Sequence, residues 1–321
     1  MAAKPQLYSI DDFEQYAAEY LPKTVRDYFN GGALDSVTLN ANRAAYSKWY
    51  IRPRVLRDVS KLKPQRRVFH DGHEIRFPCC VAPAAMQKMA HPDGEEATAR
   101  GCGAYGTAMG LSSFSTTSLE DAKKQADAAR HASGKTGDSE CVMQMYLFEN
   151  RATTDDLVWR AEKAGYKAIV LTVDTPYFGR RLTEIRNRFK LPSHLKMANF
   201  PESLGVKTGS HHRTEELSKG GSSTTTTSST PANKNVGGRV PVHFDGGVRR
   251  GSDIFKALCL GADMVWIGRP ALWAIAYDGE AGLVSALHIL EDEFRACMAL
   301  AGCSTLDELT PDLLMRVDSK L

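Results

Sequence analysis

The chain has 321 residues, enough for one large domain or two small ones, and 42% of them are hydrophobic while 25% are charged. This composition is typical of a globular protein with a sizeable core. The net charge of +3, with Lys and Arg spread along the chain, argues against a nucleic-acid-binding surface.

The N-terminal segment is expected to be helical. Its opening stretch, MAAKPQLYSIDDFEQY, lacks the apolar core of a secretory signal, and no apolar run in the chain is long enough to span a bilayer. We therefore expect a soluble protein that is not secreted and has no membrane partner. Residues 9–32 have the pattern of two short helices, separated by Pro22 and ended by Gly31 and Gly32.

Short apolar runs then alternate with helical patterns along the chain. The strand-like runs lie at 77–85, 107–113, 141–147, 167–174, 240–247 and 264–270. The helical patterns lie at 94–106, 119–132, 155–166, 252–262 and 283–302. Strands with so few polar residues are expected to be parallel and buried on both faces by helices.

These patterns give six strand–helix units, whereas a closed barrel of this α/β class has eight. The sequence therefore predicts a TIM (β/α)8-type barrel that lacks two βα units. The stretch GGSSTTTTSSTPANKN at 220–235 lies where those units are expected, and it is too polar to bury anything. We divide the single domain into a helical and lead-in segment, a first barrel part, a low-complexity junction, the last barrel units and a C-terminal tail: 1–76, 77–200, 201–237, 238–303 and 304–321.

Two late strand ends combine glycine with arginine, in FDGGVRRG (244–251) and IGRP (267–270). Glycine lets backbone N–H groups approach a phosphate, and arginine grips phosphate oxygens with two hydrogen bonds. The loops after the last two strands are also the usual phosphate site of such barrels. The alternative is turn glycines beside solvated arginines. The candidate residues are Asp245, Gly246, Gly247, Arg249, Gly268 and Arg269.

Earlier strand ends carry further polar or bare backbone groups. They are the Ala-Pro-Ala-Ala run at 82–85, Ser112, Gln144 and Thr172. A planar heterocycle needs such donors and acceptors along its edge, although a single Ser or Thr at a strand end is usually a helix cap. A third group is Tyr28, Tyr146 and Arg181, with Arg181 placed to bind a carboxylate. Sequence alone favours a surface ion pair for this arginine.

Two features bear on the compartment. Seven cysteines in apolar surroundings, with no C-x-x-C pair, indicate buried free thiols in a reducing compartment rather than disulfides or a zinc site. The last three residues, Ser319, Lys320 and Leu321, match the S-K-L signal of the peroxisomal import receptor. We therefore expect a peroxisomal protein.

Together the motifs resemble the family of FMN-dependent α-hydroxy-acid oxidases and dehydrogenases, and the glycolate oxidases most. The resemblance covers residues 5–200 and 238 to the end of the chain. It is carried by LPKTVRDYFNGGA (21–33), APAAMQKMAHPDGE (82–95), LSSFSTTSLE (111–120), QMYLF (144–148), LTVDTPYFGRR (171–181), NRFKLP (187–192) and FDGGVRRGSDIFKALCLGADMVWIGRP (244–270).

The resemblance implies oxidation of a short (S)-2-hydroxy acid, such as glycolate or lactate, to the 2-oxo acid, with FMN as cofactor and oxygen reduced to hydrogen peroxide. It implies that the backbone of Pro83, Ala84 and Ala85 lies against the flavin. It assigns the ring edge to Ser112, Gln144 and Thr172, the ribityl phosphate to the glycine–arginine set, and the hydroxy acid to Tyr28, Tyr146 and Arg181. Phe114 stands where glycolate oxidases often have Trp, which leaves the preferred substrate size open.

Two motifs implied by the resemblance are absent from this sequence. One ends in Lys-Gly-Val or similar, and its lysine stabilises the reduced flavin. The other is Ser-Asn-His-Gly-Gly-Arg-Gln or similar, with the catalytic base and a second carboxylate-binding arginine. No catalytic residue is therefore assigned: His211 and His212 lie at the break, near 204–219, and His243 lies within a strand.

Three hypotheses remain open on the sequence: an impaired oxidase, a non-catalytic flavin-binding remnant, and an incomplete gene translation of an ordinary oxidase. Whether the chain forms a homo-oligomer also stays open. No metal site is expected.

Overall fold

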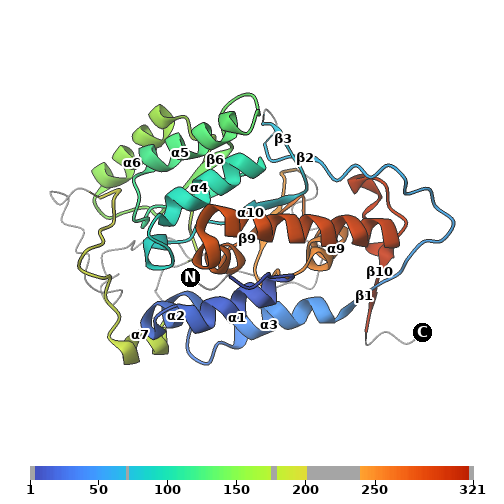
Figure 1. Cartoon of the computed structure of the whole chain (residues 1–321), viewed down its shortest axis with the longest axis horizontal. Coiled ribbons are helices and arrows are strands. Elements are labelled where there is room, and N and C mark those ends of the chain that lie inside the picture. Colours follow the sequence, from blue (N-terminus) through green and yellow to red (C-terminus); the bar gives the residue numbers. More distant parts are fainter. Residues whose placement is uncertain (1–3, 70–71, 175–178, 201–238, 318–321) are drawn as a thin grey trace. The chain divides into compact units, whose positions relative to one another are not determined.

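The computed structural model describes residues 4–69, 72–174, 179–200 and 239–317 (Figure 1). The chain forms two compact units, which we describe separately. The first unit comprises residues 1–21, 38–79 and 230–321, and the second comprises 22–37 and 80–229. Ser319, Lys320 and Leu321, like His211 and His212, lie outside the described residues.

The second unit is built on four parallel strands, which pair in chain order: β4 (Cys79–Val81), β5 (Met109–Ser112), β6 (Cys141–Met145) and β7 (Ala168–Leu171). The first three lead into α4 (Gly94–Tyr105), α5 (Leu119–Ala132) and α6 (Arg151–Ala164). These helices pack side by side, α4 on α5 and α5 on α6 (Figure 1). Two shorter helices, α2 (Lys23–Asn30) and α7 (Leu182–Asn187), pack on each other in the same unit.

Capping explains where the helices of this unit begin. Ser118 accepts a hydrogen bond from the Asp121 N–H at 3.1 Å, and α5 has the bounds that the sequence predicts. Asn150 does the same for the Ala152 N–H at 3.1 Å. Helix α6 therefore begins four residues before the predicted start at 155, because the apolar pattern carries no sign of this cap.

Strand β7 differs from its neighbours in burial. Strands β4, β5 and β6 are buried throughout. In β7, Ile169, Val170 and Leu171 are 40%, 40% and 42% exposed. The prediction that every strand is buried on both faces is therefore wrong for β7. The reason is that β7 pairs with β6 alone among the described residues, so its other edge and part of both faces are uncovered.

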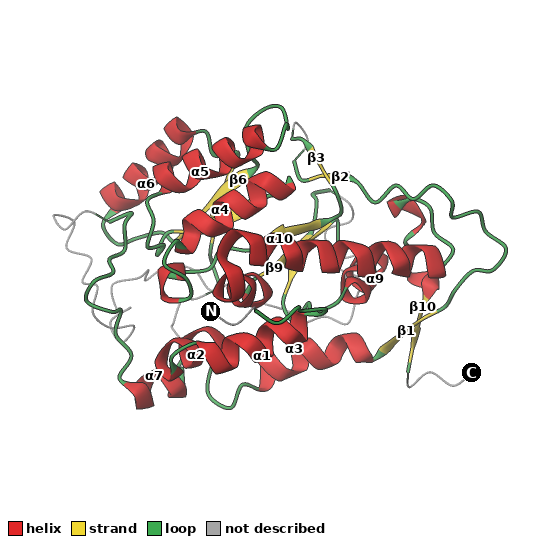
Figure 2. Cartoon of the chain, in the orientation of Figure 1, coloured by secondary structure: helices red, strands yellow, loops and turns green. Residues whose placement is uncertain are grey.

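The first unit contains two more parallel strands, β8 (His243–Asp245) and β9 (Met264–Ile267), which pair with each other. Strand β9 is buried, whereas β8 is exposed along its length, so the prediction of two buried faces is wrong for β8 as well. They lead into α9 (Gly251–Cys259) and α10 (Arg269–Leu300), and α10 packs on α9 and on α1 (Ile10–Tyr20) (Figure 2). The remaining elements are α3 (Val37–Ser47), the antiparallel pair β1 (Trp49–Ile51) and β10 (Leu314–Arg316), and the pair β2 (Arg66–Arg67) and β3 (Glu74–Ile75).

Helix α10 is longer than predicted. It begins directly after β9 rather than at residue 283, and its backbone is non-helical at Asp278 and Gly279. This break explains why the sequence pattern indicates only the second part. The predicted N-terminal helices are confirmed: α1 ends at Tyr20, and α2 begins after Pro22 and ends before Gly31.

The described residues thus contain six parallel strands, and each is followed along the chain by a helix. This confirms the predicted α/β barrel type of fold. All seven cysteines are free thiols, and six of them are buried, as predicted. None of the helices within the described ranges is long and apolar enough to cross a membrane.

The open edge of β7 gives a first prediction. Replacing Val170 with lysine should reduce concentration-dependent self-association, because a charge on an exposed edge strand opposes pairing with another chain. Light scattering and sedimentation velocity across a concentration series measure the effect. Val158→Lys is the matched control, because Val158 lies on helix α6 and is 38% exposed. Equal self-association of wild type and Val170→Lys would show that the β7 edge does not pair with another chain.

Candidate functional site

The ends of β5, β6 and β7 bring three of the predicted residues together in the second unit. Ser112 and Gln144 are opposite each other in the strand register. The Gln144 side chain donates from Nε2 to the Thr172 hydroxyl at 2.8 Å and accepts the Ser113 N–H at 3.2 Å. The Thr172 N–H is bonded to the Met145 carbonyl at 2.9 Å. The result is a connected row of donors and acceptors along one end of the sheet.

The Ala-Pro-Ala-Ala run follows β4 in the same unit. Residues 83–85 are partly exposed, whereas the residues on either side of them are buried. Pro83 lies close against β5, because a Cβ on Gly110 would come within 2.6 Å of the proline ring. Glycine at this position therefore permits the approach. The Ala84 carbonyl accepts a hydrogen bond from the Gln87 side chain at 3.1 Å.

The predicted substrate group, Tyr28, Tyr146 and Arg181, is also brought together within this unit. The Arg181 guanidinium carbon lies 5.9 Å from the centre of the Tyr28 ring, which stacks on Phe189 at 4.6 Å. Burial raises the pKa of Tyr28 to about 12, and the Arg181 charge opposes that rise. Burial also raises the pKa of Tyr146, and the Arg181 charge again opposes the rise. Both phenols are therefore neutral hydrogen-bond donors near pH 7, with a cation close by.

Arg181 also has an ion-pair partner. Its Nη1 lies 2.8 Å from Oε1 of Glu184, and the Glu184 side chain is only 7% exposed. Arg181 is the residue before α7, so Glu184 stands within the first turn of that helix. The ion pair favoured by the sequence is present, and a bound carboxylate would compete with Glu184 for the guanidinium.

An aromatic cluster around Phe114 was not predicted from the sequence. Phe114 lies 5.7 Å from the Tyr146 ring and 5.6 Å from the Phe200 ring, between centroids. Phe148 meets Phe114 edge to face at 6.3 Å. In the sequence, the one sign of a role for Phe148 is its position in the QMYLF motif. The cluster places bulky apolar side chains next to Tyr146.

Arg249 is the central residue of the glycine–arginine corners in the first unit. It is buried, its guanidinium lies 4.4 Å from the centre of the Trp273 ring, and its Nε has no hydrogen-bond partner among the described residues. The nearest carboxylate oxygen, on Glu14, is 3.8 Å from this Nε. Burial lowers the pKa of Arg249 to about 10; Glu14 raises it, while Arg43 and Arg269 lower it further. Arg249 is thus a buried cation with an unused N–H beside two more arginines.

The glycines of these corners have two different roles. Gly247 has a φ of +76°, and a Cβ there would come within 2.5 Å of the Asn42 carbonyl oxygen on α3. Gly246 has a φ of +100°, and its carbonyl accepts the Tyr46 hydroxyl at 2.9 Å. For these two, the turn and its contact with α3 already require glycine.

Gly268 differs from them, because no atom of the described residues other than its chain neighbours lies within 4 Å of where its Cβ would stand. It directly precedes α10, and Arg269 is the first residue of that helix. Open space at a helix N-terminus next to arginine suits an anion. The Arg249 Nε, which has no hydrogen-bond partner among the described residues, and this space therefore fit a phosphate group. Asp245 lies at the exposed end of β8.

His243 does not have the properties of a general base. It lies in β8, as predicted, and its Nδ1 accepts the Trp266 indole N–H at 3.1 Å. Burial lowers the pKa of His243, Asp263 raises it and Arg66 lowers it. The neutral ring then carries its proton on Nε2. Both nitrogens are committed, and neither is free to take a proton from a substrate.

Comparison with known proteins gives consistent results. Residues 17–234 and 220–316 match the sequence profile described as FMN-dependent dehydrogenase. 2-Hydroxyacid oxidase 1 of Homo sapiens is 36% identical, with 97% of each chain covered, and Glycolate oxidase 3 of Arabidopsis thaliana is 40% identical, with 95% of each covered. A structure of mandelate oxidase with (S)-4-hydroxymandelic acid is 30% identical at a TM-score of 0.82, covering 96% of this chain and 98% of that one.

These alignments also reveal a gap. The alignment with the human protein has 372 positions, whereas the chain has 321 residues, so at least 51 positions have no counterpart here. The two profile matches overlap at 220–234. The human relative therefore contains residues that have no counterpart in this chain.

The state of His243 gives a second prediction. Its pKa is lowered in the fold, so its stabilising contribution is present above the ordinary value of 6.5 and is lost as the pH falls through the folded value. Between pH 7.5 and 5 the melting temperature of the wild type should fall slightly further than that of His243→Gln. The difference is small because His243 is exposed, so solvent screens its charge. If the melting temperatures of the two proteins fall by the same amount between these pH values, His243 has no role in the pH dependence.

Proposed function

Because the chain belongs to the FMN-dependent dehydrogenase family, we propose that it binds FMN and oxidises a short (S)-2-hydroxy acid, such as glycolate or lactate, at a low rate. The products would be the 2-oxo acid and, with oxygen as acceptor, hydrogen peroxide. The observation that carries this proposal is the buried Arg249 guanidinium, whose unpaired Nε fits the phosphate of the cofactor.

In this proposal some of the cofactor residues belong to the first unit and some to the second, and each set is described within its own unit. In the first unit, Arg249, Arg269 and Gly268 hold the phosphate, while Asp245, Gly246 and Gly247 lie along the ribityl chain. In the second unit, the backbone of Pro83, Ala84 and Ala85 contacts the flavin ring, and Ser112, Gln144 and Thr172 bond its edge. FMN, when bound, supplies the ring that accepts two electrons from the substrate.

The hydroxy acid is bound by the second unit. Arg181 pairs with its carboxylate, in competition with Glu184 at 2.8 Å. Tyr28 and Tyr146 donate hydrogen bonds, since both phenols keep their protons near neutral pH. Phe114 lies against Tyr146, so its ring is placed beside the side chain of the bound acid.

Proton transfer is the step that this chain performs poorly. The substrate hydroxyl must lose a proton, and His243 already accepts the Trp266 N–H. The family histidine motif is absent from the sequence. Loss of a general base typically reduces a rate by about 10²–10⁴-fold, and loss of the lysine and arginine removes charge stabilisation as well.

A second candidate function is favoured by the missing segment. With at least 51 aligned positions absent, the chain would be a flavin-binding remnant without turnover. An incomplete gene translation explains the same gap, and sequencing the transcript between codons 200 and 240 distinguishes it from the other two.

An anaerobic flavin titration tests the activity. FMN-loaded protein should lose its visible flavin absorption slowly after glycolate or lactate is added, because the substrate residues are present and the base is not. Hours of contact without bleaching of a bound flavin would support the remnant instead. A chain that releases FMN on desalting would contradict the whole proposal.

Replacement of Arg249 tests the phosphate site separately. Arg249→Gln should weaken FMN binding roughly 10- to 100-fold, the range for losing hydrogen bonds to a charged group, and leave riboflavin binding nearly unchanged. Fluorescence titration with both flavins gives the ratio. Arg250→Gln is the control, because Arg250 already pairs with Asp11 at 2.9 Å and Glu293 at 3.1 Å. Equal affinity of the wild type for FMN and riboflavin would exclude a phosphate site.

We also propose peroxisomal import, supported by the S-K-L sequence at residues 319–321. A fluorescent protein fused to the N-terminus of the chain should accumulate in peroxisomes and should remain in the cytosol when these three residues are deleted. Identical distributions of the two fusions would contradict import through this signal.

A further inference from the structure

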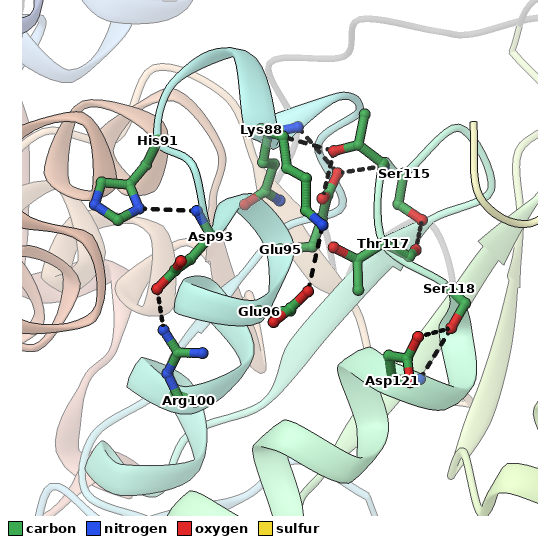
Figure 3. A network of polar contacts seen from close by, with 12 residues as sticks. Lys88, His91, Asp93, Glu95, Glu96, Arg100, Ser115, Thr117, Ser118 and Asp121 are labelled. Carbon is green, nitrogen blue, oxygen red and sulfur yellow. Dashed lines mark hydrogen bonds and ion pairs between the residues drawn. The ribbon is translucent and has the colours of Figure 1, made fainter. Parts of the chain in front are cut away.

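One buried carboxylate in the second unit connects two loops that follow neighbouring strands. Glu95 is the second residue of α4, and its side chain is fully buried. Oε1 accepts the N–H of Gln87 at 2.9 Å and the N–H of Thr116 at 2.8 Å, and Oε2 accepts the Thr116 hydroxyl at 2.6 Å. Figure 3 shows Glu95 between the segment carrying Lys88 and the loop carrying Ser115 and Thr117.

Further hydrogen bonds complete this connection. The Thr116 Oγ1 also accepts the Lys88 N–H at 3.1 Å. The Met86 N–H donates to the Phe114 carbonyl at 3.2 Å. Three consecutive backbone N–H groups, from residues 86 to 88, are thereby fixed to the loop at 114–116 or to Glu95 itself.

The connection reaches the flavin-contacting run through Gln87. The Gln87 side chain donates from Nε2 to the Ala84 carbonyl at 3.1 Å, and its Oε1 accepts the Thr98 hydroxyl at 2.5 Å. Gln87 is itself only 2% exposed. The backbone of residues 83–85 is therefore connected to Glu95 by a series of hydrogen bonds that runs through the buried Gln87.

The chemistry of this position favours a carboxylate. Two backbone N–H groups and one hydroxyl converge on its two oxygens, and a carboxylate provides only acceptors. Glutamine would turn its NH₂ group toward the Thr116 hydroxyl, which would then have to accept this hydrogen bond as well as that of the Lys88 N–H. The first turn of a helix also favours negative charge, and Met86 has a φ of +57°, a left-handed backbone that persists only where surrounding contacts hold it.

We propose that Glu95 is a positioning residue, which holds residues 83–85 and the Phe114 loop as one rigid surface for the flavin ring and the substrate side chain. This inference rests on the proposed function and deepens it. Glu95 acts through Gln87 and Thr116 and contacts neither flavin nor substrate.

Glu95→Gln tests the role. Affinity for FMN and for riboflavin should fall by the same factor, roughly tenfold or more, because the ring is common to both flavins. This pattern differs from that of Arg249→Gln, where only FMN binding weakens. Glu96→Gln is the matched control, since Glu96 is partly exposed and pairs with Lys88 at 3.3 Å.

Thr116 provides a rescue series. Thr116→Ser keeps the hydroxyl that bonds Glu95 and Lys88 and should bind both flavins like the wild type. Thr116→Val keeps the shape, loses the hydroxyl and should weaken both flavins as Glu95→Gln does. A defect in the serine variant equal to that in the valine variant would contradict the hydrogen-bonded role.

Amide hydrogen exchange on the flavin-free protein provides a readout independent of the cofactor. In Glu95→Gln, peptides covering residues 82–90 and 113–118 should exchange roughly tenfold faster, while α5 and α6 exchange as in the wild type. Faster exchange throughout the unit, or none in the two peptides, would overturn the positioning role. A wild type that binds no flavin would refute the proposed function alone, because the exchange result still decides whether Glu95 holds the two loops.

Discussion

A parallel strand satisfies its backbone and covers its side chains only when it has neighbours on both edges, and β7 and β8 each have one among the described residues. Their exposure follows from this constraint. Apolar residues such as Ile169 and Val170 stand 40% exposed in a strand whose sequence is that of a buried one. The alignment with the human relative contains at least 51 positions that have no counterpart in this chain.

Each group of residues that we propose for cofactor or substrate binding is held by local contacts within its own unit. Gln144 bonds Thr172 directly, and Arg181 lies over Tyr28. Arg249 is fixed against Trp273 on the helix that follows its own strand pair. The contacts of the proposed binding residues thus do not depend on the histidine motif, which is absent from the sequence.

Burial determines how these groups behave. It keeps Tyr28 and Tyr146 protonated, lowers the pKa of Arg249 to about 10, and keeps His243 neutral. Binding residues are improved by such desolvation, since a buried cation with an unused N–H attracts an anion strongly. A general base needs a free lone pair, which His243 does not have.

The sequence by itself determined the strands, most helices and the absence of the family's base, because apolar periodicity, caps and motifs are local properties of the chain. Only the tertiary structure showed that β7 and β8 are exposed, that Gly246 and Gly247 serve contact with α3 while Gly268 leaves open space, and that α10 starts at Arg269. Nor could sequence show Glu95 as a shared acceptor for residues 87 and 116. Such features depend on which distant segments of the chain contact each other. The periodicity of one segment does not indicate which other segments pack against it.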